Sequence, residues 1–102
     1  MSRRQKLEAM LVDEPQDQTL RYMLALELEK EGDHDRSLTL LAGLQADADP
    51  YVPSFLMAGQ QLTRLGRIDE ARSAFRSGIV AAGKCGDDHA ESELGRFLEE
   101  LD

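Results

Sequence analysis

The feature that most constrains the fold is an internal repeat marked by two glycines, Gly32 and Gly66, which lie 34 positions apart. Each glycine separates two segments whose apolar residues recur at the spacing of a helix. Between such segments a helix has to end and the chain has to turn, which glycine allows at little conformational cost. The repeat therefore predicts two helical hairpins, each made of a helix, a tight turn and a second helix.

The two copies, residues 18–50 and 52–84, agree in residue type more than in identity. The identical positions are Met23 with Met57, Leu28 with Leu62, Gly32 with Gly66, and Asp35 with Asp69. After the turn, each copy has a small residue suited to a close approach of two helices, and then a bulky residue one helical turn later. These residues are Ser37 and Leu41 in the first copy, and Ala71 and Phe75 in the second.

We expect the first helices of the two copies over about residues 18–31 and 51–65, and the second helices over about 35–47 and 69–82. Asp17 is predicted to cap the first of these helices, because a carboxylate there accepts hydrogen bonds from unpaired backbone N–H groups. Pro50 is predicted to lie in the first turn of a helix, where its missing N–H loses no bond. The residues expected to face the core are Leu24, Ala25 and Leu28 in the first copy, and Phe55, Ala58, Gly59 and Leu62 in the second.

Both ends of the chain extend the pattern. Residues 2–13 resemble the second half of an earlier repeat, because Leu7 and Met10 lie 34 positions before Leu41 and Leu44, and Ser2 and Gln5 are spaced as a capping box. Residues 88–101 repeat the apolar spacing of a first helix, offset by 39 positions, in Leu94, Phe97, Leu98 and Leu101. The other face of this last helix is acidic, which is what the terminal helix of a stacked array needs.

The formal charge of −8 is spread unevenly: residues 1–6 carry +3, residues 7–36 carry −6, residues 37–86 carry +1 and residues 87–102 carry −6. An acidic surface repels phosphate backbones, so we expect no nucleic-acid partner. The simplest interpretation of the acidic segments is a solvated surface, and the alternative is a basic partner.

Apolar runs are too short to span a bilayer, and the N-terminal residues lack the apolar core of a secretory signal. Cys85 is the single cysteine, so no internal disulfide forms. We therefore expect a cytoplasmic protein with no membrane partner.

The chain resembles the tetratricopeptide repeat (TPR) family, whose signature is a 34-residue helix–turn–helix period with W-x₂-L-G-x₂-Y, then A-x₃-F, then P. The second copy matches this pattern with Phe55, Ala58, Gly59, Leu62, Ala71 and Phe75. The first copy matches it less well, with Arg21, Leu24, Ala25, Leu28, Ser37 and Leu41 in the same positions. The resemblance implies an all-α fold, a right-handed α-solenoid of antiparallel helical hairpins with about six helices. We expect a single domain over 1–102, made of a half-repeat helix (2–13), two repeats (18–50 and 51–84) and a capping helix (88–101).

The resemblance also implies a concave groove lined by the first helices of successive repeats, which binds a peptide or helix of a partner. One residue along from the core-facing stripe, this groove is predicted to hold Thr19, Tyr22, Leu26 and Glu29 in the first repeat, and Pro53, Leu56, Gln60 and Thr63 in the second. One TPR subclass uses lysine, arginine and asparagine to grip the C-terminal carboxylate of chaperones. Tyr22, Leu26, Leu56 and Gln60 stand there instead, so that function is not expected.

A protein–protein interaction module is the predicted function, and its partner is an unidentified protein or peptide. The first alternative is a structural module that self-assembles into a homo-oligomer without a separate ligand. The second alternative is an enzyme, which would need a nucleophile or a second titratable group beside His34, and no motif supplies one.

No catalytic, cofactor-binding or metal-binding residue is predicted. Cys85 and His89 flank Asp87 and Asp88, but two soft ligands are too few for structural zinc, and Asp88 is more simply an N-cap of the last helix. Basic residues from Arg64 to Arg76 could form an anion-binding patch, although Asp69 lies within helical reach of Arg72 and pairing is the simpler interpretation.

Overall fold

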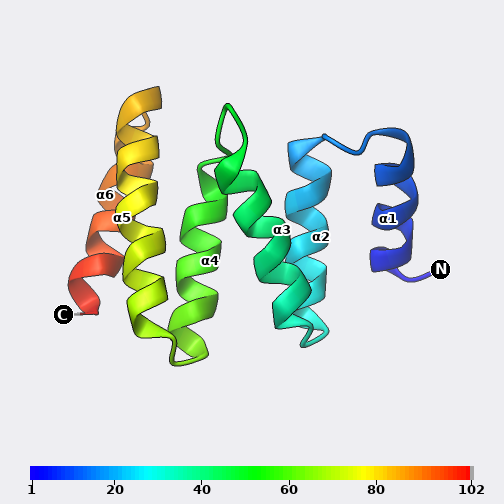
Figure 1. Ribbon diagram of the computed structural model, residues 1–102, viewed down its shortest axis with the longest axis horizontal. Helices are drawn as coiled ribbons and strands as arrows, with labels where there is room; N and C mark the ends of the chain where they lie inside the picture. The colour runs from blue at the N-terminus through cyan, green and yellow to red at the C-terminus, as the bar shows by residue number, and fades with distance from the viewer. Residues whose placement is uncertain (102) are drawn as a thin grey trace. The chain divides into compact units, whose positions relative to one another are not determined.

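The computed structural model describes residues 1–101, which form six α-helices and no strand. The helices are α1 (Arg3–Asp13), α2 (Gln18–Lys30), α3 (His34–Ala46), α4 (Pro53–Arg64), α5 (Ile68–Cys85) and α6 (Asp88–Glu100). Figure 1 shows α2 with α3, and α4 with α5, running antiparallel to each other. The predicted all-α fold of TPR-like helical hairpins is confirmed, and the helix bounds lie within three residues of those expected for α2, α3, α4 and α5.

The chain divides into two compact units, with α1, α2 and α3 in the first (Met1–Asp49) and α4, α5 and α6 in the second, which begins at Pro50. This division falls one residue before the expected boundary between repeats 18–50 and 51–84. The assignment of residues 1–102 to one domain with those repeats stays a prediction.

The same turn closes three of the helices. Gly32, Gly66 and Gly86 have φ angles of 82°, 77° and 75°, in the left-handed region that glycine favours. In each case the N–H of the next residue donates to a carbonyl near the helix end; the N–H of Asp33, for example, donates to the oxygen of Leu28 at 2.9 Å. The sequence prediction of glycine turns after α2 and α4 is therefore correct in its physical mechanism.

Helix starts agree with the sequence at two positions and differ at two. The capping box of Ser2 and Gln5 is present, and Asp17 accepts a hydrogen bond from the N–H of Leu20 at 2.9 Å. The N-cap of α6 is Asp87 instead of Asp88, since the Asp87 carboxylate reaches the N–H of Ala90 at 3.0 Å. The expectation for Pro50 is also wrong, because α4 begins three residues later, at Pro53.

The first unit has a core of leucines between α1 and α2: Leu7, Leu20, Leu24 and Leu28. Ion pairs hold α1 to α2 as well, including Arg3 with Glu27 at 2.9 Å and Arg4 with Glu31 at 2.8 Å. The correspondence of Met10 with Leu44 does not extend to burial, because Leu44 is fully buried in its hairpin while Met10 is 50% exposed. The main contacts of α1 are with α2 alone, so one side of α1 stays in solvent.

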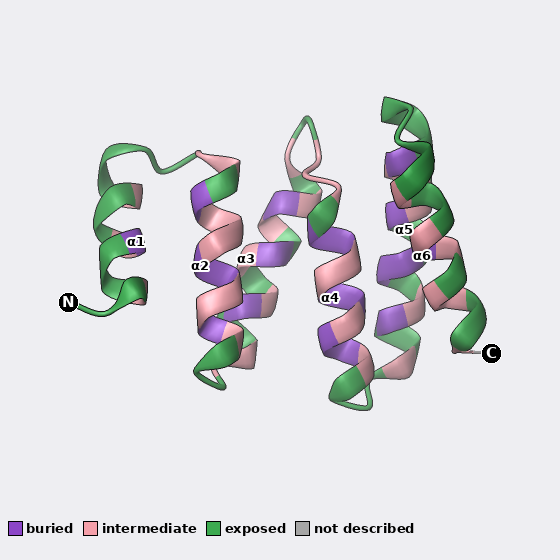
Figure 2. Cartoon of the chain, turned by 180° about the vertical axis from the view of Figure 1, so that it is seen from behind, coloured by how far each residue is buried: buried purple, intermediate pink, exposed green. Residues whose placement is uncertain are grey.

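In the second unit, α5 packs against α4 and α6 (Figure 1). The buried apolar residues of the second unit are Phe55, Ala58, Leu62, Ala71, Ala74, Phe75, Ala82 and Leu94. Figure 2 shows buried positions recurring along α4 and α5, with half-buried positions between them in α4 and half-buried or exposed positions between them in α5. No helix among residues 1–101 is both long enough and apolar enough to cross a membrane.

Candidate functional site

In the first unit, the predicted binding face lies on α2 beside the buried stripe of Leu24, Ala25 and Leu28. Thr19 is exposed, whereas Tyr22, Leu26 and Glu29 are half-buried. The helix thus carries apolar side chains on two adjacent sides, and those on the second side keep part of their surface in solvent.

In the second unit, the predicted face on α4 also lies beside a buried stripe and keeps part of its surface in solvent. Pro53 is exposed, and Leu56, Gln60 and Thr63 are half-buried next to a stripe that is fully buried. The α2 and α4 residues belong to different units, so their union into one eight-residue groove stays a prediction.

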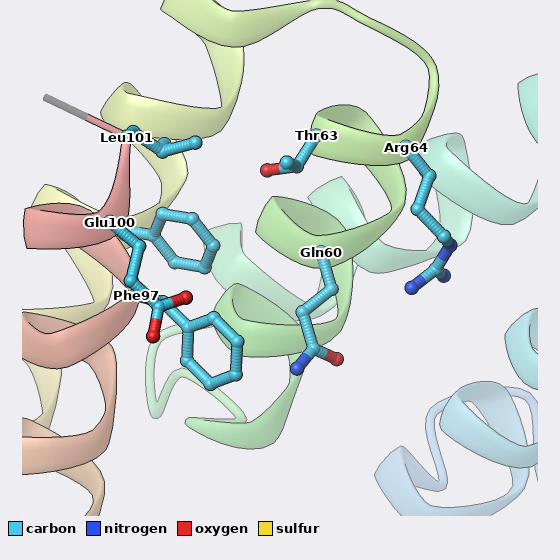
Figure 3. Close-up of a pocket in the computed structure, with 7 residues that line it drawn as sticks. Gln60, Thr63, Arg64, Phe97, Glu100 and Leu101 are labelled. Atoms are coloured by element: carbon cyan, nitrogen blue, oxygen red, sulfur yellow. The ribbon is translucent and has the colours of Figure 1, made fainter.

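A hollow of about 360 Å³ adjoins the α4 face inside the second unit (Figure 3). It is lined by Gln60, Thr63 and Arg64 of α4, Phe75 of α5, Phe97 and Glu100 of α6, and Leu101 just after α6. Gln60 and Thr63 are therefore the predicted α4 site residues that line this hollow, and Pro53 and Leu56 are not among its lining residues.

The residues from α6 and its end were not predicted as site residues. Phe97 and Leu101 were assigned to the side of the last helix that packs on its neighbours, and both are half-buried instead of buried. The sequence does contain a pattern that could have indicated them. Glu100 is next to Leu101 and one helical turn after Phe97, so a charge lies at the rim of an apolar strip.

The apolar floor of the hollow is aromatic. Phe75 is buried and stacks on Phe97, with ring centroids 5.9 Å apart and planes inclined by 22°. The guanidinium of Arg96 lies 5.5 Å from the centroid of the Phe97 ring, which places a cation against that ring. Phe97 thus connects the buried core to the accessible surface of the hollow.

A second cation holds the α6 wall in place. The Nη2 atom of Arg72, on α5, donates to the carbonyl oxygen of Leu101 at 3.0 Å, and its Nη1 atom pairs with Asp69 at 3.0 Å. A basic side chain at the end of a helix satisfies a carbonyl that lacks a partner within the helix. The pairing of Asp69 with Arg72 also agrees with the simpler interpretation of the basic patch.

The first unit uses a polar clasp where the TPR pattern has an aromatic residue. Arg21 pairs with Asp47 at 2.7 Å, and the Nε2 atom of Gln18 donates to the same carboxylate at 2.9 Å. These hydrogen bonds, from Arg21 first and Gln18 second, lower the pKa of Asp47. The departure from the family pattern at Arg21 therefore has a structural cause, a bond between the start of α2 and the end of α3.

Groups of three or more His, Cys, Asp or Glu side chains that could hold a metal ion do not occur among residues 1–101. Cys85 is exposed at the end of α5, and its Sγ lies 3.5 Å from the oxygen of Ala82.

The residues that line the hollow offer an aromatic surface, an amide, a hydroxyl and charges, which are groups suited to reversible binding.

The fold and this site define an array of helical hairpins, and the comparisons with solved structures name its family. The solution structure of a tetratricopeptide repeat domain protein from Salinibacter ruber is 31% identical, with a TM-score of 0.79 over 86% of this chain and 89% of that chain. A crystal structure of a tetratricopeptide repeat domain protein from the same organism is also 31% identical, with a TM-score of 0.73 over 84% and 96% of the respective chains.

A third solution structure, of a protein from Bordetella parapertussis, is 31% identical with a TM-score of 0.79, and the match covers 99% of this chain and 88% of that chain. No protein-family model and no curated protein matches the sequence significantly. The identity and coverage show that this chain belongs to the tetratricopeptide repeat family. Membership in this family indicates a protein-interaction module in general.

Proposed function

We propose that this chain is a non-catalytic module that binds a helix or an extended segment of a partner protein. The binding residues are Thr19, Tyr22, Leu26 and Glu29 on α2, and Pro53, Leu56, Gln60 and Thr63 on α4. The single cysteine agrees with a cytoplasmic location, and the acidic surface argues against nucleic acid as a partner.

The observation that carries this proposal is the hollow beside Gln60 and Thr63, which exposes part of an aromatic core. Phe97 is half-buried, so part of its ring remains available to a partner. Concave sites with an apolar surface and a few polar groups are the usual sites of ligand binding.

The energetic anchors of such a contact are expected to be Tyr22, Leu26 and Leu56. Aromatic and apolar side chains contribute most of the binding free energy when a partner excludes water from them. An amphipathic helix fits because its apolar residues recur at helical spacing and lie against a strip of this kind.

Self-association is the second candidate, and the exposure of α1 favours it. Met10 is 50% exposed and Val12 is 80% exposed, so a second copy could cover them. A mass measured by light scattering at increasing protein concentration separates the candidates, since a binding module without self-association stays monomeric.

The proposed function is tested by panning the full chain against a random peptide library displayed on phage. We expect the selected peptides to lose binding to a Leu26→Asp variant, since a charge buried against an apolar ligand costs free energy. Val80→Asp is the matched control, because Val80 is an apolar residue of α5 that is 57% exposed and lies outside the proposed face.

Both variants have to keep the melting temperature of the parent protein, as measured by circular dichroism. Peptides that bind the Leu26→Asp variant as well as the parent chain would place the binding site elsewhere. A large drop in the melting temperature of Leu26→Asp would instead assign Leu26 to the core and overturn the assignment of this face.

A further inference from the structure

We infer that the hollow between α4 and α6 receives an apolar side chain of a partner segment that carries a lysine or arginine next to it. This inference rests on the proposed function and adds the chemistry of the partner. The partner is a different protein, and Glu100 is the residue that selects its positive charge.

The first argument is the shape of the hollow. Its volume of about 360 Å³ lies at the lower end of the range for ligand sites, roughly 300–1,000 Å³. Phe75 and Phe97 form one stacked pair, and Leu101 lies at the edge of the same hollow (Figure 3). A space of this size suits one apolar side chain and its backbone better than an entire helix face.

The polar groups on α4 leave this apolar surface accessible. The hydroxyl of Thr63 donates to the carbonyl oxygen of Gly59 at 2.7 Å, so its hydrogen-bonding need is met within α4. In Figure 3 the Gln60 side chain lies between Phe97 and Arg64. Gln60 is therefore placed to hydrogen-bond the backbone of a segment whose apolar side chain lies against Phe97.

The second argument is the charge of the α6 wall. Glu100 is exposed and forms no ion pair within residues 1–101, and residues 87–102 carry a net charge of −6. A group of like charges attracts a cation over the first ten ångströms or so and repels an anion. An acidic or phosphorylated segment is therefore disfavoured in this hollow.

The cations near the hollow do not cancel this preference. Arg72 is bound to Asp69 and to the carbonyl of Leu101, and Arg96 lies over the Phe97 ring with Glu93 4.0 Å away. The guanidinium of Arg64 lies on the other side of Gln60 from Glu100 (Figure 3). The Glu100 end of the hollow is thus its acidic end.

A second copy of the chain is the competing occupant, because its α1 exposes Met10 near Lys6. The net charge of −8 opposes the association of two identical copies, whereas a partner with lysine or arginine beside its apolar residue gains from the same field. For this reason the structure favours a different protein over a second copy.

The test uses the full ¹⁵N-labelled chain and three synthetic peptides with a common helical pattern. The first peptide carries leucines flanked by lysines, the second carries the same leucines flanked by glutamates, and the third carries alanines in place of the leucines. We expect the leucine–lysine peptide to shift the amide resonances of Gln60, Thr63 and Phe97. It should bind about tenfold more tightly than either of the other peptides, since it alone has both the apolar and the charge contact.

Two neighbouring carboxylates supply a matched pair of variants. Glu99 and Glu100 are both exposed on α6, but only Glu100 lines the hollow. Glu100→Gln should lower the affinity for the leucine–lysine peptide about two- to fivefold, and Glu99→Gln should change that affinity by less than half as much. Because both variants remove one negative charge, a difference between them reports the position of the charge and not the net charge.

The outcomes separate the inference from the proposed function. Equal binding of the lysine and glutamate peptides at Gln60 and Phe97 would overturn the inference and leave the proposed function in place. Shifts confined to Tyr22 and Leu26 would have the same meaning, whereas no shift with any peptide would count against both. Resonances of the hollow that move with protein concentration alone would assign it to a second copy and overturn the inference.

Discussion

The two complete hairpins, α2 with α3 and α4 with α5, have the same type of turn but differ in the side chains that pack between their helices. Both turns use a glycine with positive φ, at Gly32 and Gly66, and both satisfy the last carbonyls of the first helix with the same hydrogen bonds. The helix interfaces that follow have different side chains at equivalent positions. The comparison shows that backbone geometry is kept by the turn, while packing is solved separately in each hairpin.

The difference in packing is an exchange of volume between two positions. The first hairpin has Ala25 and Leu41, and the second has Gly59 and Phe75 at the corresponding positions. A Cβ atom on Gly59 would overlap the Phe75 ring, so the larger aromatic residue requires a glycine opposite it. Interiors are close-packed, and a larger residue on one helix is accommodated by a smaller residue on the other.

A second exchange involves the position of the family's aromatic residue. Phe55 in the second hairpin packs on Gly78, where an added Cβ would lie 2.6 Å from the Phe55 Cβ. In the first hairpin Arg21 takes that position, and it pairs with Asp47 at the end of α3. A polar clasp in one hairpin thus replaces an apolar contact in the other.

The largest effect is expected when the glycine of the second hairpin is filled. Gly59→Ala should lower the free energy of unfolding by about 1–3 kcal/mol, because the methyl group forces the Phe75 ring to move. Alanine is otherwise the better helix former by about 0.5–1 kcal/mol. Gly95→Ala is the control, since nothing lies within 4 Å of its added Cβ, and it should raise stability in the same urea titration.

The volume exchange can be tested by giving the second hairpin the residues of the first. The test is a double-mutant cycle of Gly59→Ala and Phe75→Leu. The loss in free energy of unfolding of the double variant should be smaller, by about 0.5–3 kcal/mol, than the sum of the losses of the two single variants. The smaller side chain makes room for the new methyl group. Additive effects would mean that the two positions do not share one packing problem.

A smaller effect is expected at the hydrogen bond that only the first hairpin has. Ser37 is buried and donates to the carbonyl oxygen of Ala25 at 2.7 Å, whereas the second hairpin has Ala71 there. Ser37→Ala should cost about 1 kcal/mol in urea unfolding. Ser73→Ala, at an exposed position of α5, is the control for the higher helix propensity of alanine. If both variants changed the free energy of unfolding equally, the Ser37 hydrogen bond would not contribute to stability.

The smallest effect is expected at the polar clasp, and it depends on pH. The pKa of Asp47 is lowered in the folded chain, so its ionised form stabilises the fold above the unfolded pKa, and this stabilisation is lost as the pH falls through the folded value. Asp47→Asn should therefore lower the melting temperature at neutral pH and match the parent chain at strongly acidic pH. Asp49→Asn removes the same charge without touching Arg21, and a pH dependence equal to that of Asp47→Asn would contradict the assignment.

The turns and helices could be predicted from the sequence because their causes are local. Gly32, Gly66 and the Ser2 capping box act within one helical turn, so their residue types identify their roles. The errors at Asp88 and Pro50 are also local: two neighbouring aspartates compete for one cap, and a second proline, Pro53, lies closer to the helix start. Two of the three α4 residues that line the hollow, Gln60 and Thr63, follow in the same way from the position of the core stripe, and Arg64 does not.

The sequence by itself determined the repeat, the hairpin turns, the helix positions and the side of each first helix that is not used by the core. These follow from spacing and from backbone preferences that hold for any chain with this pattern. Only the tertiary structure decided that Phe97 stacks on Phe75, that Glu100 and Leu101 form a wall of the hollow, and that Arg72 fixes that wall. Those contacts join residues from different helices, and their geometry depends on side-chain volumes that pack together only once the helices have met.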